Sequence, residues 1–330
     1  MKICILGAGA LGSTFGAWLS EAGHEAWLLN RPNAHIAAVA RDGLDIETAE
    51  GRRRVQVRAA MSAETVGVVD LVVVLVKSFA TAEAMRQALA LVGPETLVLS
   101  LQNGLGHEEL LAEIVGPERV IAGKTYVGGV LLGPGRIRSG VAGKQTLIGE
   151  LDGQLTPRVQ AVAEAFAGAG LATTVSANIR GTLWDKLQVN VATGALTGIT
   201  QLTYGQLYSE PLLRDTALQA VAEAIAVARA AGVELGLQEP DAAWQLAREG
   251  LAPSFKTSML QSLQRGSITE IDFINGAVVR LGQQYRVPTP VNATLVACIK
   301  GIERALADRQ QEDATSLAFP RPTWNTWPSG

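Results

Sequence analysis

The stretch that decides the fold is Lys2-Ile3-Cys4-Ile5-Leu6-Gly7-Ala8-Gly9-Ala10-Leu11-Gly12, near the beginning of the chain. Its apolar first half has the length of a short buried strand, and its second half has the spacing Gly-x-Gly-x-x-Gly. Gly7 would allow a tight turn, Gly9 a close approach of the backbone to a pyrophosphate, and Gly12 close packing of helix on strand. A helix that begins at Ala10 would also direct free N–H groups at phosphates. We predict a dinucleotide-binding turn made of Gly7, Ala8, Gly9, Ala10, Leu11 and Gly12; a tight turn without a ligand is the alternative.

Strands and helices alternate through the first half of the chain. Apolar runs of strand length recur at residues 25–29, 70–76, 96–99 and 120–122, and helical segments are expected at 10–22 and 81–91. This rhythm is typical of a parallel sheet that helices cover on both faces. Between residues 124 and 150 glycine turns separate short strands, so we expect a mixed or antiparallel edge there.

The second half of the chain has a helical pattern. Apolar residues recur at helical spacing after residue 178, most clearly over residues 211–231 and 271–281. The fold class expected is therefore α/β, with an N-terminal Rossmann-type doubly wound sheet followed by an all-α C-terminal domain. We place the nucleotide-binding domain at 1–177, the helical domain at 178–312, and an irregular, proline-containing tail at 313–330.

Composition excludes several classes of partner and site. The 330 residues carry 28 Lys and Arg against 31 Asp and Glu, so there is no basic excess for nucleic acid. The uncharged stretch 3–20 contains four glycines, which argues against a membrane helix or signal peptide. Two cysteines, Cys4 and Cys298, cannot form a disulfide framework or a four-ligand zinc site, so we expect no metal. We expect both to be buried thiols in a reducing compartment, the cytoplasm.

The end of the second strand indicates which dinucleotide is bound. An NAD site places Asp or Glu there, about 20 residues beyond the glycines, to bind the ribose 2′-OH. This chain has Asn30-Arg31-Pro32 instead. An arginine can pair with a 2′-phosphate, whereas a carboxylate would repel it. Arg31 therefore favours NADP(H); a solvated arginine is the alternative.

A ketone reduction needs a proton donor, and the chain offers few. We expect His24, His35 and His107 to lie at the surface, with His107 the only one plausibly near a site. Lys186 and Asn190 are four residues apart, which places them on one helix face. Burial would depress the pKa of such a lysine and make it a usable acid, but a surface lysine is the alternative.

Two further segments of the helical half have a structural explanation as well as a functional one. Ser267-Ile268-Thr269-Glu270 has the pattern of a capping box, in which Glu270 bonds back to the N-cap. Ser258 could cap a helix. Both Glu270 and Ser258 could equally contribute to a site.

Together these residues resemble the ketopantoate reductase family, over residues 1–305. The resemblance depends on the glycine turn, Arg31, Lys77 after an apolar strand, Leu101-Gln102-Asn103-Gly104, the run from Trp184 to Asn190, Ser258-Met259-Leu260-Gln261, and Thr269 to Gly276. It implies reduction of a 2-keto acid to a 2-hydroxy acid by NADPH, with 2-dehydropantoate as the foremost substrate, in pantothenate biosynthesis.

The resemblance also implies the role of each site residue. Lys186 would donate the proton, Glu270 would orient the substrate hydroxyl or the lysine, and Asn190 would hold the substrate. Ser258 would bind the substrate carboxylate. Lys77 and Asn103 would lie beside the nicotinamide half of the cofactor.

Three positions depart from the family pattern. Gly194, Tyr204 and Ser262 stand where the family often has asparagine, asparagine and aspartate. A pocket with fewer polar groups would suit a larger or less hydroxylated keto acid, so a broad-specificity D-2-hydroxyacid dehydrogenase of the same family remains an alternative. A non-catalytic NADP-sensing module and an imine-reducing opine-type dehydrogenase are alternatives from other classes. The apolar helical half is compatible with a homodimer.

Overall fold

The computed structural model describes residues 1–249 and 251–318, and the remainder of the predicted tail, 319–330, lies outside the described residues. The chain forms two compact units. Unit 1 contains Met1–Gln188 and Ile225–Glu239, and unit 2 contains Val189–Ala224 and the described residues from Pro240 onward. The long helices α7 (Ile179–Thr200) and α9 (Pro211–Ala230) contribute to both units.

Unit 1 is built on a central sheet of eight strands with the order β12-β11-β8-β7-β6-β1-β2-β5. All neighbouring strands are parallel except β8 and β11, which are antiparallel. The parallel α/β sheet and its mixed edge are therefore confirmed. The strands are β1 (Lys2–Leu6), β2 (Glu25–Leu29), β5 (Arg58–Ala60), β6 (Leu71–Val74), β7 (Leu97–Ser100), β8 (Val120–Thr125), β11 (Thr146–Gly149) and β12 (Thr173–Val175).

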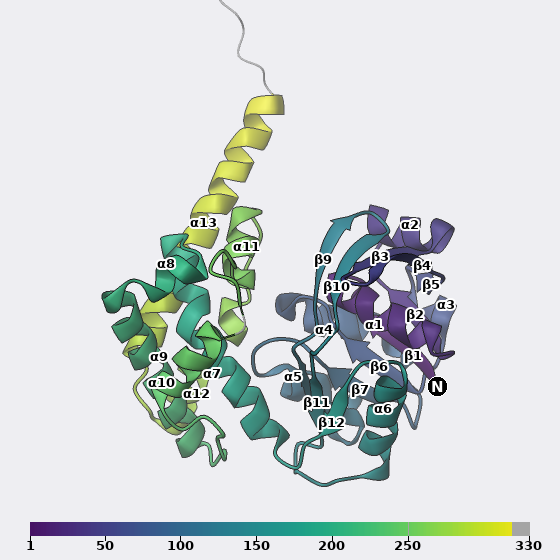
Figure 1. Cartoon of the computed structure of the whole chain (residues 1–330), viewed down its shortest axis with the longest axis horizontal. Coiled ribbons are helices and arrows are strands. Elements are labelled where there is room, and N and C mark those ends of the chain that lie inside the picture. Colours follow the sequence, from purple (N-terminus) through teal and green to yellow (C-terminus); the bar gives the residue numbers. More distant parts are fainter. Residues whose placement is uncertain (250, 319–330) are drawn as a thin grey trace, which may run out of the picture. The chain divides into compact units, whose positions relative to one another are not determined.

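Helices cover both faces of the central sheet, as Figure 1 shows. The period-2 alternation of β1 directs Ile3 and Ile5 into one apolar core, with Phe15 and Phe166, and Cys4 and Leu6 into the other. The helices of unit 1 besides α7 and α9 are α1 (Ala10–Glu21), α2 (Ala34–Asp42), α3 (Ala63–Val66), α4 (Thr81–Gln87), α5 (His107–Val115) and α6 (Pro157–Gly168), with short 3-10 helices η1 (Ser78–Ala80), η2 (Leu89–Leu91) and η3 (Pro117–Arg119).

The two cysteines differ in exposure. Cys4 is fully buried in β1, and this burial raises the pKa of its thiol to about 12. Cys298, however, is exposed on α13 (Pro290–Ala318), so the prediction that it is buried is wrong. The helix is amphipathic, and residue 298 lies one position before the buried Ile299, on a side that the core does not reach.

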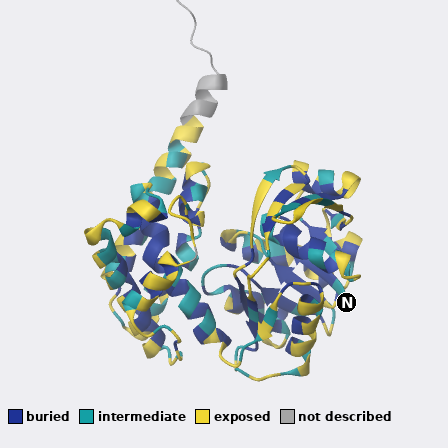
Figure 2. Cartoon of the chain, in the orientation of Figure 1, coloured by how far each residue is buried: buried dark blue, intermediate teal, exposed yellow. Residues whose placement is uncertain are grey.

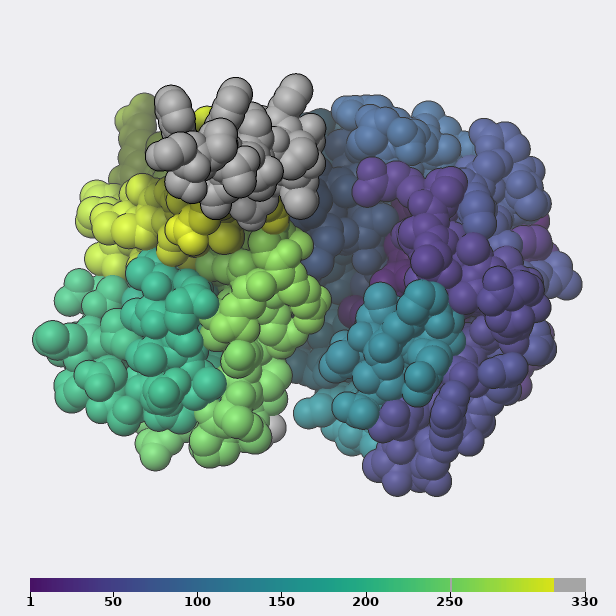
Figure 3. All heavy atoms as spheres, turned by 90° about the horizontal axis from the view of Figure 1, so that it is seen from above, coloured from purple at the N-terminus to yellow at the C-terminus, as the bar shows by residue number. Residues whose placement is uncertain are grey.

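A second, four-stranded sheet lies beside the central one and was not predicted. Its order is β4-β3-β10-β9, and we call it the satellite sheet. Its apolar face contributes Leu44, Ile46 and Ile137 to the core that α1 also covers. Most of β9 is exposed, as Figure 2 shows, and the β9–β10 hairpin lies at the molecular surface in Figure 3. The strands are β3 (Leu44–Thr48), β4 (Gly51–Val55), β9 (Gly128–Gly133) and β10 (Arg136–Gly140).

Unit 2 is helical, as expected. Among the described residues no helix is both long enough and apolar enough to cross a membrane. α13 extends to Ala318, beyond the position at which we expected an irregular tail, because no proline follows Pro290 until Pro320. Besides α7, α9 and α13 the unit contains α8 (Tyr204–Tyr208), α10 (Pro240–Arg248), α11 (Ser258–Gln264), η4 (Ile271–Phe273) and α12 (Asn275–Tyr285).

Candidate active site

The glycine turn joins β1 to α1, and each glycine has a distinct steric reason. Gly7 has φ +111°, and a Cβ there would lie 2.5 Å from the Val76 nitrogen. A Cβ on Gly12 would lie 2.0 Å from the Gly7 carbonyl oxygen. A Cβ on Gly9 would meet nothing within 4 Å. The protein therefore leaves the space above Gly9 open, as a dinucleotide pyrophosphate at this turn requires.

The other members of the turn prepare the start of α1. Ala8 is buried, and its N–H donates to Asn30 Oδ1 at 3.3 Å, which ties the turn to the end of β2. Ala10 and Leu11 begin the helix and are half-buried. Gly9 is the N-cap and offers no side chain, so the first N–H groups of α1 have no side-chain cap. Such a terminus suits an anion.

A cavity of about 570 Å³ opens at this turn, where β1, β2 and β6 end. Gly7, Gly9, Arg31 and Lys77 line it. Arg31 is exposed, and among the described residues its guanidinium makes no hydrogen bond or ion pair. The structure thus brings together the glycine turn and both predicted cations, in the crevice where open α/β sheets bind their ligands. These residues fit a dinucleotide.

Asn103 follows β7 and is not among the described residues that line this cavity. Its carbonyl oxygen accepts from His107 Nε2 at 3.0 Å and from Ser78 Oγ at 3.5 Å. His107 is fully buried at the start of α5, so its predicted surface position is wrong. The ring lies between the loops that follow β6 and β7, where it fixes the Asn103 segment.

The other two histidines differ from each other. His24 lies between α1 and β2 and is half-buried, and its Nδ1 is 3.3 Å from the N-terminal amino group. His35 is buried, with 7% of its surface exposed, because it packs between α1 and the β9–β10 turn. The surface prediction is therefore also wrong for His35. A sequence pattern does not reveal a satellite sheet that covers this ring.

Lys186 lies on α7, opposite the end of β8. Its Nζ donates to the Thr125 carbonyl oxygen at 2.7 Å and lies 5.6 Å from the centroid of the Tyr126 ring. The pairing of β7 with β8 ends at Ala122, so the Thr125 carbonyl makes no hydrogen bond to β7 and can accept from Lys186. The side chain is half-buried. This geometry orients a primary ammonium group within unit 1, the unit that contains the dinucleotide cavity.

Lys124 is the functional candidate that sequence reasoning missed. It is 6% exposed, and its Nζ donates to the Thr182 carbonyl oxygen at 2.8 Å. Burial is the main reason why its pKa is lowered, against the opposing charge of Asp185. The only signal in the sequence is a lysine directly after the apolar run of β8.

The predicted substrate residues lie in unit 2. Asn190 is half-buried, one turn after Lys186 on α7, and Ser258 is exposed as the first residue of α11. Among the described residues the side chains of Asn190 and Ser258 make no hydrogen bond. The cap of α11 is Thr257, which accepts from Leu260 N–H at 3.1 Å, so the capping role considered for Ser258 belongs to its neighbour.

Glu270 is half-buried and precedes the 3-10 helix η4. Residues 267–270 are not helical, and the first helix after Ser267 is η4, which begins at Ile271, so the capping box predicted at Ser267 is wrong. Two hydrogen bonds to α13 stabilise the turn at Thr269. The Thr269 N–H and hydroxyl both donate to Glu303 Oε1, at 2.7 and 2.6 Å. The carboxylate that satisfies this turn comes from α13, not from Glu270.

Two of the positions that depart from the family pattern lie in the interior of unit 2. Tyr204 is 5% exposed, and its hydroxyl lies 3.1 Å from Thr193 Oγ1. A Cβ on Gly194 would lie 3.5 Å from the Met259 methyl carbon. Ser262 is half-buried on α11. Aromatic and thioether groups therefore lie at or against positions where the family often has polar side chains.

Comparisons with known proteins cover both halves of the chain. Residues 3–153 match the family model "Ketopantoate reductase PanE/ApbA", and residues 178–303 match the model of its C-terminal domain. A 2-dehydropantoate 2-reductase from Halobacterium salinarum is 35% identical over 92% of this chain and 99% of that protein. One from Aquifex aeolicus is 32% identical over 92% of this chain and 97% of that protein.

Two solved structures extend the comparison. A PanE/ApbA family ketopantoate reductase from Ralstonia eutropha JMP134 superposes with a TM-score of 0.85 at 36% identity, covering 93% of this chain and all of that one. A D-mandelate dehydrogenase solved with NADH and anilino(oxo)acetate superposes with a TM-score of 0.86 at 27% identity, with the same coverage.

Proposed function

We propose, because this chain belongs to the ketopantoate reductase family, that it reduces 2-dehydropantoate to pantoate with NADPH. The observation that carries the proposal is the combination, within unit 1, of an open glycine turn and an oriented lysine ammonium. An anion-binding turn serves a dinucleotide, and an ammonium group serves as the acid that a ketone reduction needs.

The cavity at the glycine turn would hold the cofactor. The N–H groups at the start of α1 would bind the pyrophosphate, and Arg31 would pair with the 2′-phosphate of NADPH. Because Arg31 has no other partner among the described residues, it can turn toward that phosphate without breaking an ion pair. Lys77 and Asn103 would position the nicotinamide half. When bound, NADPH supplies the hydride.

Lys186 would donate the proton. A hydride that adds to the keto carbon leaves negative charge on the oxygen, and a nearby ammonium stabilises that charge and then protonates it. The Thr125 carbonyl accepts a hydrogen bond from one of the three N–H groups of the Lys186 ammonium, and this fixes the directions of the other two N–H groups.

Three side chains of unit 2 would hold the substrate. Asn190 would donate to the substrate, and Ser258 would bind its carboxylate. Glu270 would accept from the substrate hydroxyl or orient Lys186. The roles of Asn190 and Ser258 are supported by their side chains, which make no hydrogen bond among the described residues.

A second candidate function is the reduction of 2-keto acids with aromatic or bulky apolar groups. Tyr204 and Gly194, which lies beside the Met259 methyl, favour it, because they stand where the family often has asparagine, and a pocket with fewer polar groups would suit such substrates. The likeness to D-mandelate dehydrogenase supports the same candidate, and that protein was solved with NADH.

A panel of 2-keto acids tests both candidates. We expect NADPH oxidation with 2-dehydropantoate to exceed that with phenylglyoxylate, and NADPH to be preferred over NADH. Arg31→Ala should lower kcat/KM for NADPH by about 10- to 100-fold, the worth of a charge-assisted phosphate contact. It should leave NADH almost unaffected. Equal use of both cofactors by the wild type would contradict the role of Arg31, and a preference for phenylglyoxylate would favour the second candidate.

Replacement of Lys186 tests the chemistry. Lys186→Ala should lower kcat by about 10²- to 10⁴-fold, the usual contribution of a general acid, while the Kd for NADPH changes little. Lys144→Ala, at an exposed lysine of the same unit, is the matched control. Undiminished turnover in the Lys186 variant would remove this residue as the acid.

A further inference from the structure

Lys124 and Lys186 tie β8 and α7 together in both directions. Lys124 of β8 donates to the Thr182 carbonyl of α7 at 2.8 Å, and Lys186 of α7 donates to the Thr125 carbonyl of β8 at 2.7 Å. Thr182 precedes Lys186 by one helical turn. Lys124 therefore fixes the turn of α7 from which the Lys186 side chain extends.

Both ammonium groups also meet the same aromatic ring. The Tyr126 centroid lies 5.2 Å from Lys124 Nζ and 5.6 Å from Lys186 Nζ. Each distance is within the range of a cation–π contact. Each lysine would lose this contact if it moved away from the ring, and the two positive charges beside one ring repel each other.

Among the described residues, the hydrogen bond of the Lys124 ammonium is to one carbonyl, and a buried lysine held in this way is an unfavourable means of joining a strand to a helix. Lys124 is 6% exposed, and desolvation is the main cause of its lowered pKa. A leucine or methionine would pack at this position without the cost of burying a charge. Such costs are concentrated at functional sites, which suggests that the charge itself is used.

We propose that Lys124 is a positioning residue that acts through Lys186: it holds the first turns of α7, and its positive charge makes the Lys186 ammonium a stronger acid. This inference rests on the proposed function of Lys186 as proton donor. A like charge nearby favours the neutral form of an amine, so Lys186 would release its proton more readily to a developing alkoxide.

Other charged groups lie around the pair, and the carboxylate of Asp185 opposes this effect. Asp185, the neighbour of Lys186 on α7, acts on both Lys124 and Tyr126, but its Oδ1 accepts the N–H groups of Gly236 and Leu237 at 3.1 and 2.9 Å. That carboxylate is thus held at a loop.

On α5, which packs against β8, the buried carboxyl is that of Glu108. Its electrostatic partners are Glu109 and Arg180. Tyr126 itself has a raised pKa, mainly through burial, which favours the neutral phenol.

Three substitutions of Lys124 separate the effect of its charge from that of its hydrogen bond to Thr182. Lys124→Met removes both, Lys124→Gln keeps an N–H donor for the Thr182 carbonyl without the charge, and Lys124→Arg keeps charge and donor. We expect the alkaline limb of the kcat profile to move up by about 0.5 to 1 pH unit in the Met and Gln variants, as loss of one nearby charge predicts. In the Arg variant it should stay in place. Lys144→Gln, the loss of an exposed charge, is the control and should also leave it in place.

An NMR titration of the lysine ¹³Cε resonances gives a second readout that needs no turnover. In the wild type Lys124 should be protonated at the pH at which Lys186 titrates, and Lys186 should titrate at higher pH in Lys124→Gln. A neutral Lys124 at that pH, or an unchanged Lys186 titration in the Gln variant, overturns the inference. The wild-type result holds even if Lys124→Met fails to fold.

The same measurements distinguish a failure of the Lys124 inference from a failure of the proposed function. A wild-type protein that reduces no 2-keto acid contradicts the proposed function, while the NMR titration still decides the effect of Lys124 on Lys186. An active wild type whose alkaline limb is the same in all three variants contradicts only the present inference. If the Lys124 variants have a lower melting temperature but an unchanged alkaline limb of the kcat profile, Lys124 only stabilises the contact between β8 and α7, and the inference is wrong.

Discussion

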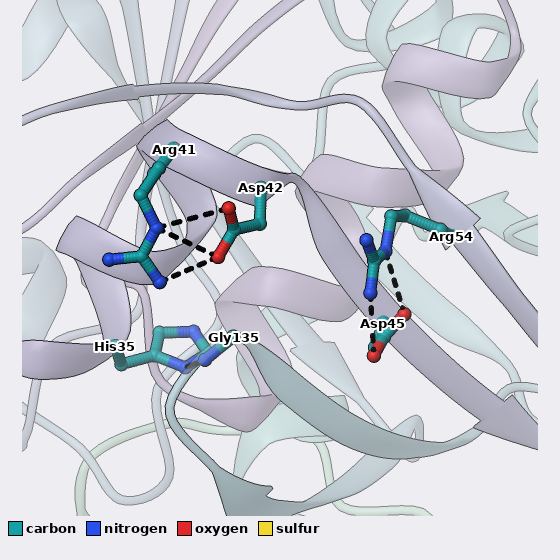
Figure 4. Close-up of polar contacts among 6 residues, drawn as sticks. All are labelled: His35, Arg41, Asp42, Asp45, Arg54 and Gly135. Atoms are coloured by element: carbon teal, nitrogen blue, oxygen red, sulfur yellow. Dashed lines mark hydrogen bonds and ion pairs between the residues drawn. The ribbon is translucent and has the colours of Figure 1, made fainter.

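The central and satellite sheets of unit 1 are held together by different forces. The strands β1, β6 and β7 are almost entirely buried and apolar, so their stability comes from removal of side chains from water. The satellite sheet has one buried face, and its other face is covered by ion pairs. Figure 4 shows one of these, between Arg54 and Asp45. Burial of apolar strands leaves a pattern in the sequence, whereas the partners of surface ion pairs do not.

Arg52, Arg53 and Arg54 illustrate the satellite sheet. Arg52 and Arg54 both pair with Asp45, at 2.7 and 3.0 Å, and hold its pKa down to about 2. Arg53 points to the other face, where it pairs with Glu21 of α1 at 2.8 Å. The alternation is that of a strand. The arginines of these pairs lie at the surface, where solvent screens the charges, so each pair contributes little to stability.

The turn that joins β1 of the central sheet to α1 leaves no room for a side chain at Gly12. Gly12→Ala would place a Cβ 2.0 Å from the Gly7 carbonyl oxygen, where α1 packs against the turn that follows β1. Because the obstacle is backbone, we expect a loss of about 3 kcal/mol or more in the free energy of unfolding, together with loss of NADPH binding. Urea unfolding and a fluorescence titration with NADPH measure the two effects.

Gly9→Ala is the matched control for this prediction. Its Cβ would meet nothing within 4 Å, so the free energy of unfolding should change by less than about 0.5 kcal/mol. The Kd for NADPH should nevertheless rise about tenfold or more, because the methyl group would occupy the space proposed for the pyrophosphate. Unchanged NADPH affinity would contradict the placement of the cofactor at this turn.

The sequence predicts the central sheet well because its signals are local. The run from Lys2 to Leu6 and the glycines after it specify strand, turn and helix without reference to distant residues. The satellite strands lack such a signal. The segment Arg52-Arg53-Arg54 looks like a solvated loop until Asp45 and Glu21 are placed beside it, and both contacts depend on tertiary structure.

The candidate site shows the same division. The glycine turn, Arg31 and Lys77 meet at one cavity, as the parallel arrangement of the strand ends predicts. The role of Lys124 could not be predicted, because its partners are a backbone carbonyl at Thr182 and a ring that Lys186 also contacts. The burial of His107 and His35 likewise depends on segments that are distant in sequence.

His35 on α2 connects α1, which packs on the central sheet, to the β9–β10 turn of the satellite sheet, and it offers a finer test of the comparison. Gly135 N–H donates to Nδ1 at 3.1 Å, so Nε2 must carry the proton and donate to Ser13 Oγ at 2.9 Å (Figure 4 shows the Gly135 side). A proton added at Nδ1 would face the Gly135 donor. Burial is the main cause of the lowered pKa of this ring.

The sign of the pH effect follows from that direction. Because the folded pKa lies below the ordinary value of 6.5, the unfolded chain binds the proton more readily as the pH falls below 6.5, and stability is lost. Glu108 opposes this effect: burial raises its pKa to about 7, so it stabilises the fold as it is protonated over the same range. Only a comparison of variants isolates the histidine.

His35→Gln removes the titration but keeps an acceptor and a donor. At pH 5 the wild type should have lost about 1 kcal/mol of unfolding free energy more than the Gln variant, relative to pH 7.5, the worth of the hydrogen bond from Gly135 that a proton at Nδ1 would break. Urea unfolding of both proteins between pH 5 and 7.5 measures this difference, and the Glu108 contribution cancels in it. Parallel pH curves would mean that the satellite sheet adjusts to a charged His35, and that the contact between the two sheets is looser than this geometry indicates.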